Sequence, residues 1–216
     1  MRSPRKPDPM RRKRRTQTME AFLNVISAAL ASIFVQNMVL ERALGANVLL
    51  YASRKKEHVI GFAAAIAYTT TISAPFAWLF DTIFGGYANY RIIMPLLYVL
   101  TIALIYILTL VVIWRFFPKF FKSLRRYVHL SVFNCSVIGA LFLCSQQGKD
   151  IFAYLGYGVG TGLGFLVAAY LLYAASARLN SPLIPAAFRG YPIMIVYVGI
   201  LSLALYAFTG YSTSAL

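Results

Sequence analysis

The side chains best suited to chemistry lie in the stretch HLSVFNCSVIGALFLC, residues 129–144, where Asn134 and Cys135 interrupt an apolar run. A thiolate is a soft ligand that suits iron, although a buried cysteine in a helix is the alternative interpretation. The Asn134 amide needs a hydrogen-bond partner in hydrocarbon, so we expect a break in the helix there. Cys144 follows Cys135 about 13 Å further along a helix, which is too far for a disulfide.

A second polar group lies in VQNMVLERALG, residues 35–45. Glu41 and Arg42 are too polar for the middle of a membrane span. They mark either the inner end of a span or a break buried in protein where their charges are compensated. Asn37 could hydrogen-bond the exposed backbone of such a break. Asp81 is expected to end the second span, near the membrane border.

The elements that carry these residues are predicted to be membrane helices. The chain is 60% hydrophobic and 12% charged, and its mean hydropathy of +0.68 excludes an ordinary soluble domain. Uncharged runs long enough to span a bilayer occupy residues 59–80, 92–114, 151–177 and 190–216. Two weaker runs, 21–40 and 127–148, bring the expected total to about six spans, of which the first and fourth are interrupted near the midplane.

The net charge of +15 is concentrated in loops. Basic residues follow the first, third and fifth spans, and these loops are predicted to be cytoplasmic by the positive-inside rule; the residues are Arg54, Lys55, Lys56, Arg115, Lys119, Lys122, Arg125, Arg126, Arg178 and Arg189. Opposite them stand only Arg91 and Lys149. Both termini should then face outward.

The basic N-terminal extension, residues 1–18, conflicts with this topology, since such a tail normally stays inside. One hypothesis is that translation starts at Met19, so that the extension is not part of the native protein. The alternatives are a disordered, lipid-binding cytoplasmic tail with reversed topology, and the start of a cleaved signal peptide. A tail that binds nucleic acid is a further, less favoured possibility.

The remaining transmembrane domain, residues 19–216, divides into two blocks of three spans, about 21–114 and 127–211. Blocks with an odd number of spans face opposite ways, so we expect inverted repeats whose broken helices meet near the midplane. Aligning residues 45–53 with 133–141 places Asn47 opposite Cys135. In GYGVGTGLG, residues 156–164, the helical spacing predicts one small face of Gly156, Gly160 and Gly164 and another of Gly158 and Gly162, each packing closely against a neighbour.

Four motifs together resemble the A-type members of the Rnf complexes and their Nqr relatives: VQNMVLERALG, AWLFDTIF, FNCSVIG and IPAAFRGYPIMIVYVGILSLALYAFTG. The resemblance implies a six-helix subunit of a redox-driven pump that couples electron transfer to Na⁺ or H⁺ movement. It also implies an oppositely oriented paralogous subunit, flavin and iron-sulfur proteins as partners, and a [2Fe-2S] cluster to which each membrane subunit gives two cysteines. Cys135 would be one ligand, with Asn134 as its neighbour.

This sequence departs from the family pattern at two positions. Asn47 stands where the first-half cysteine is expected, and an amide is a poor substitute for thiolate on iron. Residues 109–111, Thr-Leu-Val, lack the glutamate that often follows this threonine in the family. A normal four-cysteine cluster cannot form with this chain as one half of it, and the acid that the resemblance implies for ion handling is absent. The candidate residues for the membrane breaks or an ion path are Asn37, Glu41, Arg42, Gly45 and Gly139.

We predict an all-α integral membrane subunit of an Rnf/Nqr-type complex in a bacterial-type cytoplasmic membrane. No Walker loop, Ser/His/Asp arrangement or paired-carboxylate site is evident in the sequence, so any activity would belong to a complex. The alternative is a degenerate paralogue that acts as a cluster-free scaffold or as a small-solute or ion transporter. The two departures from the family pattern favour this alternative.

Overall fold

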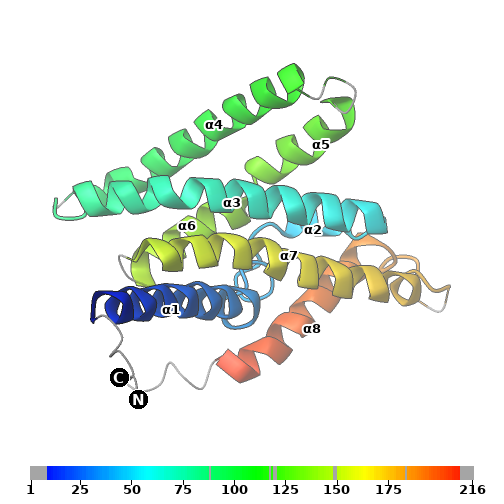
Figure 1. Cartoon of the computed structure of the whole chain (residues 1–216). Coiled ribbons are helices and arrows are strands. Elements are labelled where there is room, and N and C mark those ends of the chain that lie inside the picture. Colours follow the sequence, from blue (N-terminus) through cyan, green and yellow to red (C-terminus); the bar gives the residue numbers. More distant parts are fainter. Residues whose placement is uncertain are drawn as a thin grey trace, which may run out of the picture.

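The computed structural model of the chain describes residues 9–87, 89–116, 118, 121–147, 150–182 and 184–209. Every regular element in these residues is helical (Figure 1). The elements are α1 (Pro9–Leu30), the π-helical segment η1 (Ala31–Val35), α2 (Ala46–Ala52), α3 (Lys56–Phe84), α4 (Tyr90–Phe116), α5 (Phe121–Val132), α6 (Cys135–Gln147), α7 (Ile151–Leu179) and α8 (Tyr191–Thr209). The predicted all-α class is confirmed.

Four helical stretches are long and apolar enough to cross a membrane: Gln17–Val35, Lys56–Phe84, Tyr90–Phe116 and Ile151–Leu179. A fifth is added if the pair Leu124–Val132 and Cys135–Gln146, bent by 49°, counts as one span. Helix α8 contributes a shorter apolar stretch, Tyr191–Tyr206. The chain is thus a multi-pass membrane protein. The sixth span and the inverted repeat remain predictions, and residues 210–216 of the last predicted run lie outside the described residues.

The first predicted run, 21–40, is wrong at its end, because the helix stops at Val35. The Gln36 amide donates to the Ala31 carbonyl oxygen at 2.7 Å, which closes a π-type turn. A loop over residues 36–45 follows before α2 begins. The run 127–148 is likewise divided, between α5 and α6 at residues 133–134. Both weak runs therefore contain a break.

The glycines of α7 pack on two neighbouring helices, as their spacing predicts. Helix α7 lies between α1 and α3 (Figure 1). A Cβ atom added to Gly156 would lie 2.9 Å from Ala28 of α1, and one added to Gly158 would lie 2.8 Å from the Thr71 Cα of α3. The Thr70 hydroxyl of α3 donates to the Gly158 carbonyl oxygen at 2.6 Å. Small residues thus bring three spans close enough for hydrogen bonds between helices.

The described basic residues divide between the two ends of the bundle: Lys56, Arg115 and Arg178 lie at one end, and Arg91 and the first turns of α1, which hold Arg11 to Arg15, lie at the other. Figure 1 shows the start of α3 and the ends of α4 and α7 at the first of these ends. The end of α3, the start of α4 and the start of α7 lie at the other end. The described residues do not include Lys119, Lys149 or residues 1–8 of the basic extension. The rest of the extension is helical, because α1 begins at Pro9.

Candidate functional site

The two helix breaks lie against each other. The Ser136 hydroxyl, in the first turn of α6, donates to the Leu44 carbonyl oxygen of the loop before α2 at 2.8 Å. Gly45 has a φ of +82°, and a side chain there would collide with Asn134 and Ser136. A side chain on Gly139 would collide with Leu44. Gly45, Asn134 and Gly139, proposed from sequence as break residues, therefore share one interface.

Asn37 organises the loop after η1. Its Nδ2 atom donates to the carbonyl oxygens of Ile33 at 2.9 Å and Gly164 at 3.1 Å. Its Oδ1 atom accepts from the amides of Val39 at 3.0 Å and Leu40 at 3.2 Å. The side chain is 1% exposed. These four bonds satisfy backbone groups that the break would leave unpaired in an apolar interior.

Asn134 performs a related task at the second break. Its Oδ1 atom accepts from the Ser136 amide at 3.0 Å and from the Ser136 hydroxyl at 3.1 Å, which caps the first turn of α6. Its Nδ2 atom is buried and has no hydrogen-bond partner among the described residues. An unused donor therefore lies beside Cys135 in the chain.

The candidate ligand positions lie at the starts of two helices. Cys135 is the first residue of α6 and its side chain is exposed. Asn47 is the second residue of α2 and is also exposed. Cys144, by contrast, is 2% exposed and belongs to the hydrophobic core. The structure thus presents one thiol at the surface of the chain.

These residues do not fit a [2Fe-2S] cluster that takes two cysteines from this chain. Such a cluster needs thiolate or imidazole ligands at all four positions, and Asn47 supplies neither. Cys144 faces the core and cannot replace it. Within the described ranges, no group of three or more His, Cys, Asp or Glu side chains is placed to hold a metal ion. At most, Cys135 and the adjacent Asn134 Nδ2 donor could contribute to a group completed by other chains.

Glu41 and Arg42 lie in the loop between η1 and α2, within the interrupted segment. Both side chains are exposed, and their charged atoms are 4.0 Å apart. An exposed pair of neighbouring residues at this distance adds little stability. The pair therefore lies in the loop that follows the first span, and this chain does not enclose it, so the choice between the two sequence interpretations stays open.

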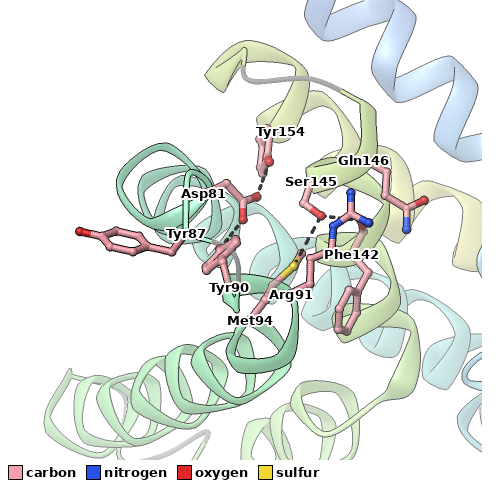
Figure 2. A pocket seen from close by; sticks show the side chains of 10 residues that line it. Asp81, Tyr87, Tyr90, Arg91, Met94, Phe142, Ser145, Gln146 and Tyr154 are labelled. Carbon is pink, nitrogen blue, oxygen red and sulfur yellow. Dashed lines mark hydrogen bonds between the residues drawn. The ribbon is translucent and has the colours of Figure 1, made fainter.

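Asp81 lies in the last turn of α3, at the end of a span as the sequence predicts. Its side chain is only 7% exposed, however, so the expectation of an interfacial residue is wrong. Tyr98 donates to both of its carboxylate oxygens at 2.8 Å, and Tyr90 and Tyr154 donate to one oxygen each. Figure 2 shows Asp81 between Tyr90 and Tyr154. The structure therefore contains a buried carboxylate held by three phenol groups.

A cavity of about 590 Å³ adjoins this carboxylate. It is formed where α3 ends, α4 and α7 begin, and α6 ends, and it is lined by Asp81, Gly85, Tyr87, Tyr90, Arg91, Met94, Phe142, Ser145, Gln146 and Tyr154. Asp81, Tyr90, Met94 and Tyr154 are buried, whereas Tyr87, Arg91 and Gln146 are exposed. The cavity thus connects the carboxylate with the surface of the chain.

The sequence alone could have marked Asp81 as a candidate residue, but it could not have identified the three tyrosines that bind it. Asp81 is the only acidic residue between Glu57 and Asp150. An acidic side chain in a membrane span is a candidate functional residue by default. Tyr90 and Tyr98 are eight residues apart and share one face of a helix.

Comparison with known proteins agrees with the motifs. Residues 25–212 match the family described as "Rnf-Nqr subunit, membrane protein". The A component of an ion-translocating oxidoreductase complex from Pasteurella multocida is 31% identical over 191 residues, 88% of this chain and 97% of the relative. The corresponding A component from Azoarcus sp. is 30% identical over 181 residues, 84% of this chain and 94% of the relative.

A third relative carries a more specific name. It is the A component of the Na(+)-translocating ferredoxin:NAD(+) oxidoreductase complex of Acetobacterium woodii, and it is 26% identical over 188 residues, 87% of this chain and 98% of the relative. The similarity therefore extends over nearly the whole length of each relative and includes both helix breaks and the Asp81 cavity. On this evidence the chain belongs to the Rnf-Nqr family of membrane subunits.

Proposed function

We propose that the chain is the A-type integral membrane component of an ion-translocating electron-transport complex. The observation that carries this proposal is the near full-length similarity to relatives named as the A components of such complexes. The two helix breaks, joined through Ser136 and Leu44, support it, because transporters place interrupted helices at their binding sites.

The proposed setting is a bacterial-type cytoplasmic membrane, with the end of the bundle that holds Lys56, Arg115 and Arg178 in the cytoplasm. The clustering of Lys56, Arg115 and Arg178 at that end supports this orientation. The proposed partners are an oppositely oriented paralogous membrane protein and flavin and iron-sulfur subunits. Electron transfer between ferredoxin or NADH and an acceptor would then be coupled to Na⁺ or H⁺ movement by the whole complex.

A second candidate function is a cluster-free scaffold or transporter. It is favoured by Asn47 at the expected ligand position, which leaves Cys135 as the one thiol exposed beside the breaks. In the first function Cys135 donates one thiolate to an iron centre that partner chains complete. In the second it has no ligand role.

Affinity purification of the tagged full chain from its native membrane tests the proposal. Co-purification of flavin- and iron-containing subunits that oxidise ferredoxin or NADH supports the complex, and a chain recovered alone with no such activity contradicts it. Low-temperature EPR then separates the two functions. If Cys135 is a ligand, Cys135→Ala should remove a reducible iron signal that the buried-site control Cys144→Ala retains. Identical signals in the two variants would exclude Cys135 as a ligand.

A further inference from the structure

We propose that Asp81 and the surrounding tyrosines form a binding site for one monovalent cation, Na⁺ or a proton. The site lies at the end of the bundle opposite Lys56, Arg115 and Arg178, where α3 ends and α4 and α7 begin. The role of this site in transport rests on the proposed function, whereas its ability to bind a cation does not.

The first argument is the charge of the carboxylate. Asp81 is 7% exposed, and among the described residues the only ion pair joins Glu41 and Arg42. An ionised carboxylate in a poorly solvated site is strongly destabilising without a counter-charge. Hydrogen bonds from three tyrosines stabilise the charge but do not neutralise it. The guanidinium group of Arg91 lines the same cavity but makes no ion pair with Asp81, so a cation bound at the carboxylate, or a proton on it, would supply the direct counter-charge.

The second argument is the set of oxygen atoms. Each phenol uses its proton on Asp81, so its oxygen keeps lone pairs that can face a cation. The side-chain oxygens of Ser145 and Gln146 line the same cavity. Carboxylate and neutral oxygen ligands suit hard cations. One negative charge among neutral oxygens balances a single positive charge, so a monovalent ion fits better than a divalent one.

The third argument is access. The cavity volume of about 590 Å³ leaves room for an ion with several waters, each of which occupies roughly 30 Å³. Figure 2 shows Arg91 and Gln146 on the side of the cavity formed by the start of α4 and the end of α6. Arg91 is exposed, and its guanidinium group would repel a cation entering the cavity. Removing that charge should therefore strengthen cation binding.

The titratable and charged groups that face Asp81 come from three elements. Tyr90, Tyr98 and Arg91 belong to α4, the Cys144 thiol belongs to α6, and Tyr154 belongs to α7. Among these groups Asp81 is the one carboxylate.

The first test measures binding to the purified full chain in lipid nanodiscs. The thermal midpoint is followed as NaCl replaces choline chloride at constant ionic strength. At a Na⁺ concentration about tenfold above the apparent Kd, a Na⁺ site should raise the midpoint by about 3–6 °C. Asp81→Asn should remove this shift and Arg91→Gln should lower the Kd. The control Glu57→Gln, at the opposite end of α3, should behave as wild type.

A proton site is recognised by infrared spectroscopy. A carboxylic C=O band that titrates in wild type and is absent in Asp81→Asn identifies a proton on Asp81. If Asp81→Asn does not fold, Tyr154→Phe, which keeps the carboxylate but loses one hydroxyl, should weaken the Na⁺ shift or move the titration. Equal Na⁺ shifts and equal carboxyl bands in wild type and the variants would overturn the proposal.

The transport role is tested in the intact complex. Asp81→Asn should retain the partner subunits while ion uptake falls at least about tenfold, the loss expected when a charged ligand is removed. Unchanged ion uptake would overturn the role of Asp81 in transport. Failure of the wild-type chain to co-purify with redox subunits would overturn the proposed function, and the binding experiments would still decide whether the site exists.

Discussion

At the helix breaks polar groups bond mainly to backbone, whereas at Asp81 they converge on one carboxylate beside a cavity. Asn37 makes four hydrogen bonds, all to backbone groups. Among the described residues, the Asp81 carboxylate receives its hydrogen bonds from the side chains of three tyrosines. Backbone partners are fixed by the fold, whereas the hydroxyl hydrogens of the buried tyrosines can turn toward or away from an occupant of the site. The first arrangement suits a rigid scaffold, and the second suits a site whose occupant changes.

The comparison also separates two kinds of departure from the family pattern. Asn47 stands where the proposed iron ligand set would need a cysteine, and no group of three or more His, Cys, Asp or Glu among the described residues is placed to bind a metal ion instead. The glutamate expected after Thr109 of α4 is also absent, yet a buried carboxylate is present in α3. The chain is therefore better equipped to bind a cation than to hold an iron-sulfur cluster by itself.

The largest effect is expected for Gly45→Ala at the breaks. The substitution forces alanine to a φ of +82° and drives its Cβ into Asn134 and Ser136. Backbone strain and overpacking together should lower the free energy of unfolding by about 3 kcal/mol or more. The free energy of unfolding is measured by titrating the protein with SDS in mixed micelles. Gly199→Ala, where an added Cβ meets no atom within 4 Å, is the control. Equal stability of the two variants would show that the breaks do not pack as described.

A smaller effect is expected for Asn37→Ala. The two amides and two carbonyl groups that Asn37 satisfies would lose a partner in a site that is 1% exposed. Partial replacement by water should limit the loss to about 2–3 kcal/mol. The control is Asn180→Ala, because Asn180 is exposed and makes a single side-chain bond, to Ser176. A loss no greater than in this control would contradict the scaffold role of Asn37.

Local patterns in the sequence predicted the scaffold better than the cation site. The two glycine faces of α7 follow from helical spacing alone, so their packing on α1 and α3 could be anticipated. The break at Asn134 follows from the cost of an amide in hydrocarbon. The end of the first helix at Val35 was misplaced, because the bonds of Asn37 to Val39 and Leu40 turn an apolar segment into a loop.

The Asp81 site depends on contacts that a linear pattern does not contain. Tyr154 is 73 residues from Asp81 in the chain, and its hydroxyl reaches the carboxylate only because α7 packs beside α3. In the sequence, Asp81 is an isolated acid near the end of an apolar run. This pattern fits a residue at the membrane border as well as a buried functional carboxylate. Tertiary packing decided between these interpretations.

The smallest stability effect, and one of opposite sign, is expected for Asp81→Asn in buffer without Na⁺. Asparagine keeps an oxygen acceptor for the tyrosines and removes a buried charge that lacks a counter-ion among the described residues. The variant should be at least as stable as wild type, by up to about 1 kcal/mol, because a binding site is often less stable than its inactive variant. The same SDS titration measures this. Added Na⁺ should stabilise only the wild type and so reduce or reverse the difference. If Asp81→Asn lowered the free energy of unfolding as much as Asn37→Ala, Asp81 would have a structural role like that of Asn37. The distinction between the helix breaks and the Asp81 site would then be wrong.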